Sequence, residues 1–254
     1  MRLVLLVASM LPLVSEAQCV TRSGPATAAL VELYTSEGCS SCPPADRWFS
    51  QLKSAAARGG VVPVAFHVTY WDYIGWRDAF ADERHTARQR ARAGASGARY
   101  VYTPQVVLGG RDFRGWSSGS AVTRAIESIN RRPARADIEV RMQPFEGGKL
   151  AVHATVTVLP GTRTKDLALV IAATQDGLSS RVTAGENRGE QLRHDFVVRD
   201  FAEMRPFTAE RAVASVTFSA RADWKPGAMA LVAFVQDVKT GDVLQALSAP
   251  LGRC

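Results

Sequence analysis

The order of apolar and polar segments predicts a mixed α/β region followed by an antiparallel β-sandwich. In the first half of the chain, strand-like and helix-like patterns alternate in the order β-α-β-α-β-β-α. The Arg-Arg-Pro-Ala sequence at 131–134 interrupts this order, and short alternating strands follow it, separated by turn residues such as Gly147-Gly148. We therefore expect two domains, at residues 24–132 and 135–254.

Each element of the first half follows from its own local pattern. Segment 61–68 is apolar almost throughout, as is typical of a strand buried on both faces. Helical segments carry apolar side chains three or four residues apart, as at Trp48 and Leu52. The pair Gly109-Gly110 separates two β-type runs and predicts a hairpin. The expected strands are 28–35, 61–68 and a hairpin within 100–114, and the expected helices are 46–58, 78–93 and 118–131.

The second half shows a different pattern, in which short strands alternate with turns. Apolar and β-branched residues recur at every second position, and the spacing between turns is typical of an antiparallel sandwich of roughly 100 residues. The expected strands are 137–142, 150–158, 167–174, 194–201, 212–219 and 228–236.

The first 17 residues have the composition of a secretory signal. Arg2 precedes an apolar run, and a small-x-small sequence ends at Ala17, where we place the cleavage site. The apolar run is shorter than the roughly 20 residues that span a membrane, and a retained anchor is the alternative. We therefore expect a periplasmic or secreted protein with no stable membrane span after signal cleavage, in a compartment where disulfides persist.

The chain is basic, with a formal net charge of +7. One interpretation of this charge is nucleic-acid binding. Export argues against a nucleic-acid partner, and a solvated helix face accounts better for the arginines. Those concentrated in one stretch are Arg84, Arg88, Arg90, Arg92 and Arg99.

Cys39 and Cys42 lie between the first expected strand and the first expected helix. Two cysteines at this spacing can close a small disulfide, and the N-terminus of the helix lowers the pKa of the first thiol. We interpret them as a redox pair without a cofactor, and a permanent structural disulfide is one alternative. A non-catalytic copper-binding or protein-binding module is the other. Copper is considered because soft thiolates suit Cu(I) and His67 would add a third ligand to Cys39 and Cys42.

Thr103-Pro104 stands directly before the expected hairpin strand. An X-Pro bond adopts the cis form at modest cost, and proline without its N–H belongs at a strand start. The element order, the position of the cysteine pair and this dipeptide together resemble the thioredoxin fold. That resemblance implies a cis Pro104 that faces the cysteines and presents backbone groups to a bound peptide.

Longer motifs are similar to those of a family of secreted bacterial thioredoxin-like proteins of unknown function. The first contains the sequence Gly-Cys-Ser-Ser-Cys-Pro-Pro-Ala-Asp, and the similarity covers nearly the whole mature chain. Thr69 departs from the family pattern, which usually has an acidic residue two positions after the histidine. The resemblance implies a fold but no settled substrate. The matching segments are 32–46, 67–78, 102–105 and 185–189.

Thiol–disulfide exchange with exported protein thiols or disulfides is the expected activity. Cys39 precedes the helix and is expected to be the more exposed sulfur and the nucleophile, while Cys42 resolves the mixed disulfide. Thr103 and Pro104 are the expected substrate-binding residues. Trp71 and Trp76 are expected to cap the cysteine pair, and an apolar platform for an unfolded peptide is the alternative.

Three further features carry expectations of their own. Asp72 and His67 are candidate acid/base residues, although Asp72 as a helix N-cap and His67 as a structural residue are the alternatives. Cys19 and Cys254 are the remaining cysteines and are expected to form a structural disulfide. The polar sequence from 185 to 195 is expected to form a loop and strand edge facing the first domain, with a partner surface as the alternative.

Overall fold

Strands predominate over helices in residues 19–143 and 145–253, which this computed structural model describes. The helices are α1 (Pro43–Ser50), α2 (Lys53–Ala57), α3 (Glu83–Ala95) and α4 (Gly119–Asn130). The strands are β1 (Cys19–Arg22), β2 (Ala29–Thr35), β3 (Val61–His67), β4 (Gln105–Leu108), β5 (Arg111–Asp112), β6 (Ala136–Met142), β7 (Lys149–Val158), β8 (Leu167–Gln175), β9 (Leu178–Arg181), β10 (Gln191–His194), β11 (Val197–Phe207), β12 (Arg211–Ser219), β13 (Met229–Asp237) and β14 (Val243–Pro250). The expected signal segment lies outside the described residues.

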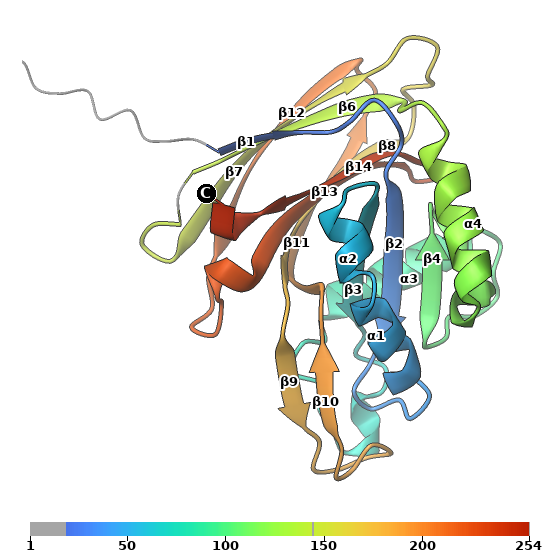
Figure 1. The fold of residues 1–254 in the computed structure, drawn as a ribbon, viewed down its shortest axis with the longest axis vertical. Coiled ribbons are helices and arrows are strands. Elements are labelled where there is room, and N and C mark those ends of the chain that lie inside the picture. The colour runs from blue at the N-terminus through green and yellow to red at the C-terminus, as the bar shows by residue number, and fades with distance from the viewer. Residues whose placement is uncertain (1–18, 144, 254) are drawn as a thin grey trace, which may run out of the picture.

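Two large sheets and one small hairpin organise these strands (Figure 1). The larger sheet has eight strands in the order β14-β13-β8-β11-β3-β2-β4-β5, and a four-stranded sheet has the order β1-β6-β7-β12. Strands β9 and β10 pair only with each other. The two-stranded unit runs beside α1, at the end of the molecule opposite the four-stranded sheet (Figure 1).

The expected fold class, a thioredoxin-like α/β domain followed by an antiparallel β-sandwich, is wrong. The structure is mostly β-sheet, and its largest sheet takes strands from both halves of the chain. The junction is a parallel pairing of β11 with β3, in which Val197 stands opposite Ala65 and the Ala65 N–H donates to the Phe196 carbonyl at 2.8 Å. Whether residues 24–132 and 135–254 fold as separate domains stays a prediction.

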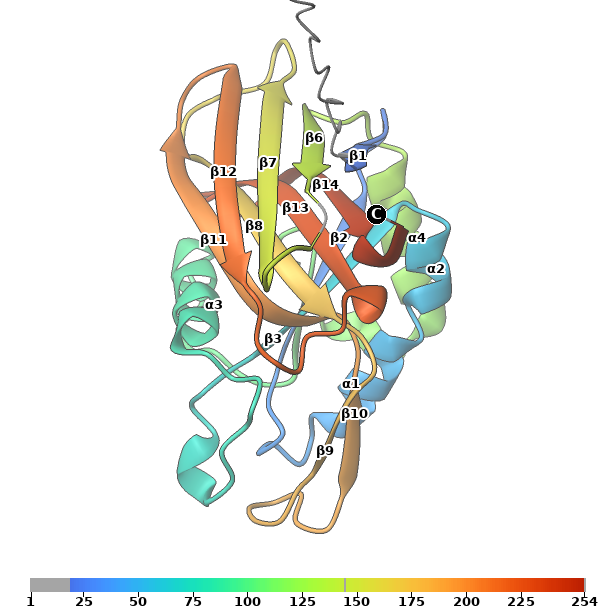
Figure 2. The same cartoon turned by 90° about the vertical axis from the view of Figure 1, so that its left-hand side faces the viewer.

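Helices cover both faces of the part of the large sheet that contains β2 and β3. Helices α1, α2 and α4 lie on one face and α3 on the other (Figure 2). Every residue of β2 and of β3 is buried, as a strand covered on both faces requires. Leu30 and Tyr34 point into the core under α3, whereas Val31 and Leu33 point into the core under α1 and α4.

The four-stranded sheet packs on the other end of the large sheet. In β6 and β7 buried residues alternate with residues that are less buried, so only one face of this sheet meets the core. Ile138 and Val140 of β6 belong to the same core cluster as Leu169 and Ile171 of β8. A sandwich therefore exists, but one of its two layers is the continuation of the helix-covered sheet.

Helix α3 does not present a purely solvated arginine face. Arg88 is buried, and its Nη2 donates to Glu32 Oε2 at 2.8 Å and to Gln236 Oε1 at 3.0 Å. Its guanidinium also lies over the rings of Phe66 and Phe234. Arg88 thus holds α3 against strands from both halves of the chain.

Several expected boundaries shift for local reasons. The expected helix 46–58 is two helices, α1 and α2, and the expected helix 78–93 begins at Glu83. Asp82 sets that start, because its side chain accepts the Arg84 N–H at 2.8 Å. The strands β1, β9 and β14 are absent from the sequence-based expectation, and β10 shares only His194 with the expected strand 194–201, which corresponds to β11.

Candidate functional site

The Cys39–Cys42 disulfide lies at the junction between β2 and α1. The two Cα atoms are 5.4 Å apart, and Cys42 is the N-cap residue of α1 with Pro43 as the first helical residue. Both cysteines are fully buried, so the expected greater exposure of Cys39 is not found. Ser41 Oγ lies 3.3 Å from Cys39 Sγ, where it would donate a hydrogen bond to a thiolate.

The loop 182–190, between β9 and β10, covers the disulfide. Asn187 Nδ2 donates to the carbonyl of Glu37 at 2.8 Å and to that of Cys39 at 3.0 Å. The Ser40 N–H donates to Glu186 Oε2 at 2.9 Å, and this hydrogen bond lowers the pKa of the Glu186 carboxyl. As expected from its sequence, this polar loop faces the first half of the chain.

Aromatic residues between β3 and α3 close another side of the site. Trp71 Nε1 donates to Thr103 Oγ1 at 2.7 Å, and Trp76 Nε1 donates to Glu37 Oε2 at 2.9 Å. A Cβ atom on Gly38 would lie 3.0 Å from Trp71 Cβ, so this loop approaches the backbone beside Cys39 closely. These contacts fit the expected cap, and the substrate-binding role of the two tryptophans stays a prediction.

The Thr103-Pro104 peptide bond is cis, as expected. It directly precedes β4, whose first residue Gln105 pairs with Tyr34 of β2. The hydrogen bond from Trp71 joins Thr103 to the aromatic loop. The role of Thr103 and Pro104 in binding a substrate stays a prediction.

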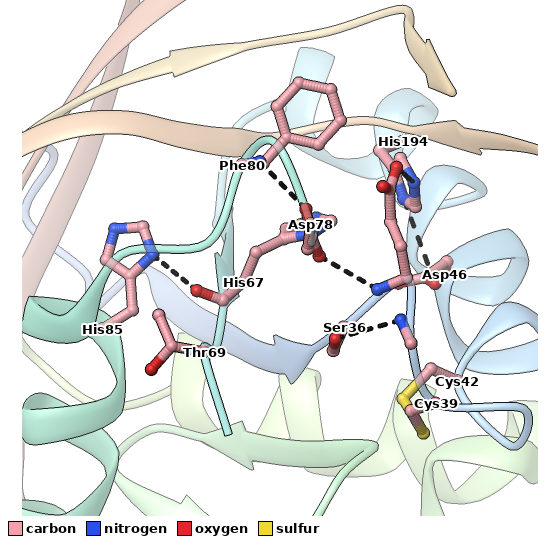
Figure 3. A network of polar contacts seen from close by, with 12 residues as sticks. Ser36, Cys39, Cys42, Asp46, His67, Thr69, Asp78, Phe80, His85 and His194 are labelled. Atoms are coloured by element: carbon pink, nitrogen blue, oxygen red, sulfur yellow. Dashed lines mark hydrogen bonds and ion pairs between the residues drawn. A yellow bond between two sulfur atoms is a disulfide. The ribbon is translucent and has the colours of Figure 1, made fainter. Parts of the chain in front are cut away.

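Five buried acidic and histidine side chains cluster beside the disulfide: Glu37, Asp46, His67, Asp78 and His194. His67 Nδ1 lies 2.6 Å from Asp78 Oδ2, and Asp78 Oδ2 also accepts the Glu37 N–H at 2.9 Å (Figure 3). His194 Nε2 lies 3.1 Å from Glu37 Oε1, and His194 Nδ1 lies 4.0 Å from Asp46 Oδ2. Asp46 lies between the disulfide and His194 (Figure 3).

Separate elements bring these groups together. Glu37 follows β2, His67 ends β3, and His194 ends β10, while Asp46 lies on α1 four residues after Cys42. Residues four apart share a helix face, and a helical side chain points back toward the N-terminus. Asp46 therefore lies on the helix face of Cys42, and its Oδ2 lies 4.0 Å from His194 Nδ1.

The cluster shifts the acidity of its members. Burial raises the pKa of the Asp46 carboxyl, and this effect exceeds the opposing influence of His194 and His67. Burial lowers the pKa of His67, but the adjacent Asp78 carboxylate outweighs it and the net shift is upward. The pKa of Asp78 is lowered in turn, because His67 overcomes the effect of its burial. His67 and Asp78 therefore form an ion pair, and the carboxyl of Asp46 is a weaker acid than that of an exposed aspartic acid.

Asp46 and His194 were not among the acid/base candidates from the sequence. The two residues that were candidates, His67 and Asp72, have different positions in the structure. His67 joins the cluster, whereas Asp72 accepts the Asp78 N–H at 3.3 Å from a half-buried position. Asp72 does not cap α3, because Asp82 does. Its acid/base role stays a prediction. Thr69, which replaces the family's usual acid, bonds to Thr86 of α3 at 2.9 Å.

Two further expectations concern metal and the remaining cysteines. Within residues 19–143 and 145–253, no three His, Cys, Asp or Glu side chains are arranged to hold a metal ion. The copper alternative at Cys39, Cys42 and His67 therefore gains no support from the geometry. Cys19 begins β1, but Cys254 lies outside the described residues, so a bridge between them stays a prediction.

None of the described helices is long and apolar enough to cross a membrane.

Comparison with known proteins gives a family and two solved structures. The family described as "Protein of unknown function (DUF1223)" matches residues 30–236. Protein AGR_C_4864 from Agrobacterium tumefaciens is 24% identical, with a TM-score of 0.62 over 91% of this chain and 96% of that chain. HBP35 of Porphyromonas gingivalis is 12% identical, with a TM-score of 0.65 over 91% of this chain and 77% of that chain. These structures share the fold, and no curated protein matches the chain.

Proposed function

The chain belongs to the DUF1223 family of proteins of unknown function, and we propose that it is an exported thiol–disulfide oxidoreductase that acts on protein thiols or disulfides. The observation that carries this proposal is the buried carboxyl of Asp46, one helical turn from Cys42 and on the same face. A disulfide that only holds the chain together needs no such group beside it. Burying a carboxyl is unfavourable unless it is compensated, so a chemical role accounts better for its presence.

The reaction balances with the residues at the site. In the reduced protein, the Cys39 thiolate attacks a substrate disulfide, forms a mixed disulfide and releases one substrate thiolate. Cys42 then gives its proton to the Asp46 carboxylate, and its sulfur attacks Cys39 Sγ. The Cys39–Cys42 disulfide forms, the second substrate thiolate leaves, and two electrons have passed from the protein to the substrate. The same steps in reverse oxidise a substrate dithiol.

Both sulfurs can be activated by groups already in place. The N-terminus of α1 stabilises negative charge on the sulfur that precedes it, and Ser41 Oγ is positioned to donate to Cys39. For Cys42, whose surroundings are buried, a neighbouring base is needed to remove the proton. Asp46 supplies that base.

Mixed-disulfide trapping tests this proposal. The reduced Cys42→Ser variant, incubated with insulin, is expected to accumulate a covalent adduct through Cys39, because no second thiol can resolve it. Mass spectrometry before and after treatment with dithiothreitol identifies the adduct. The matched Cys39→Ser variant is expected to give none, since Cys42 lies on the helix side of the pair. Absence of an adduct with Cys42→Ser, together with no insulin reduction by the wild-type protein, would overturn the proposal.

A further inference from the structure

A small cavity opens beside Asp46, between α1 and β10. Its volume is about 160 Å³, enough for several water molecules. The buried side chains of Asp46 and His194 line it, and so do the exposed residues Arg47, Glu190 and Arg193. The cavity therefore connects an otherwise buried acid and imidazole to the solvent.

The contacts of His194 determine which ring nitrogen carries the proton. Glu37 accepts from Trp76 through Oε2 and lies 3.1 Å from His194 Nε2 through Oε1. A carboxylate only accepts hydrogen bonds, so His194 donates from Nε2. In the neutral ring, Nδ1 is then an acceptor, and it is buried without a hydrogen-bond partner.

The Oδ2 atom of Asp46 lies 4.0 Å from this unpartnered nitrogen. A protonated Asp46 carboxyl would satisfy Nδ1 after a small side-chain movement. Resting on the function proposed above, we propose that Asp46 and His194 share one proton and pass the proton of the Cys42 thiol to solvent through this cavity. His194 is then a positioning residue, which holds the proton on Asp46 after the Cys42 sulfur has released it.

Proton balance follows the chemistry of the disulfide. When Cys42 loses its proton as the disulfide forms, Asp46 gains one, donates to Nδ1 and then releases a proton to water in the cavity. When the disulfide is reduced, the same path returns a proton to Cys42. A route of this kind is needed because both cysteines are fully buried.

The charges around the pair come from every neighbouring element. Glu37 after β2 and Asp78 before α3 oppose a negative charge on Asp46, whereas His67 of β3 favours it, as His194 does when its ring is charged. Arg47 of α1 and Arg193 of β10, both at the cavity, favour it as well, and Glu190 opposes it. A substitution of His194 must therefore leave these residues in place if its effect is to be assigned to Nδ1.

Two substitutions separate the two nitrogens of His194. His194→Gln keeps a donor near the position of Nε2 and removes the acceptor at Nδ1, whereas His194→Asn places an amide near Nδ1 and loses the Nε2 donor. A neutral His194 ring accepts from the protonated Asp46 carboxyl, so we expect His194→Gln to lower the pKa of Asp46 by roughly one unit. A positively charged His194 ring would itself lower the pKa of Asp46, and its removal would then raise that pKa. His194→Asn is expected to retain more of the wild-type value. The readout is the ¹³C shift of the Asp46 carboxyl against pH, with the exposed His153→Gln on β7 as control.

The rate of mixed-disulfide resolution supplies the second readout. In the wild type and in His153→Gln this rate is expected to follow the Asp46 titration, and in His194→Gln its pH profile shifts to lower pH by the same amount. An Asp46 pKa that is unchanged or raised in His194→Gln, or equal values in the Gln and Asn variants, would overturn the proton-sharing inference. If the wild-type protein does not reduce insulin, the proposed function is overturned instead, so the two failures are distinguishable.

Discussion

At the scale of single residues, Asp46 is the group on which the account depends. It is buried on the same helix face as Cys42, and its pKa is raised because burial disfavours the charged form. A carboxyl whose pKa is raised in the folded state keeps its proton at pH values where the same carboxyl in the unfolded chain has lost it. Ionisation of this carboxyl therefore lowers the free energy of unfolding, and the protein tolerates this loss of stability at the site proposed to be reactive.

The Asp46→Asn substitution tests two consequences of burying Asp46, one for the pH dependence of stability and one for the rate of thiol–disulfide exchange. The free energy of unfolding of the wild type is expected to fall, relative to Asp46→Asn, as pH rises from about 4, the ordinary value for Asp, through the raised pKa. Urea denaturation at a series of pH values measures this difference. Resolution of the mixed disulfide is expected to slow by about 100-fold or more in the same variant, because the general base is lost.

An exposed carboxyl gives the matched control for this experiment. Asp137 of β6 is solvent-exposed, and Asp137→Asn is expected to leave both the pH dependence of stability and the exchange rate unchanged. A stability difference between wild type and Asp46→Asn that stays constant from pH 4 to 8 would show that Asp46 is not titrating there. That result would contradict the role assigned to it.

At the scale of elements, the β9–β10 hairpin acts on a site formed by α1 and the end of β2. It supplies His194 to the acid cluster and the loop 182–190 to the cover. Lys53 of α2 pairs with Asp195, directly after β10, so the base of the hairpin is also fixed. A two-stranded hairpin is marginally stable alone, and its position depends on these contacts.

Removal of the Asn187 side chain tests the cover directly. Asn187→Ala loses two hydrogen bonds to the carbonyls of Glu37 and Cys39, each worth about 1 kcal/mol. We therefore expect dithiothreitol to reduce the disulfide roughly 10-fold faster in this variant, measured by quenching with an alkylating reagent and mass spectrometry. Arg188→Ala, an exposed position in the same loop, is the control and is expected to match the wild type. Equal rates for Asn187→Ala and wild type would show that the loop does not limit access.

At the scale of the whole molecule, the sequence predicts where strands lie better than which strands pair. Most strand positions agree with the expectation, but the expected fold class is wrong, because β11 pairs with β3 and the largest sheet takes strands from both halves of the chain. A signal was present in the sequence: residues 167–173 of β8 are apolar without interruption, and all nine residues of β8 are buried, whereas burial alternates in β6 and β7. Continuous burial is typical of a central strand covered on both faces, which a strand in a simple sandwich is not.

The candidate site divides in the same way between local and distant information. Local spacing was enough for the cysteine pair, whereas the cis Thr103-Pro104 bond was implied by the resemblance to the thioredoxin fold. Asp46 was also within reach of local reasoning, since it lies one helical turn after Cys42. The contact between His194 and Glu37 joins residues 157 positions apart, and no local pattern specifies it. Tertiary packing of the hairpin against α1 creates it.

The most direct test of the central claim is the reduction potential of the Cys39–Cys42 pair, measured by equilibration of the protein with glutathione buffers. A pair that exchanges with protein thiols is expected to have a potential between about −120 and −270 mV, the range of known thiol–disulfide oxidoreductases. A potential below about −300 mV is typical of a structural disulfide and would contradict the account.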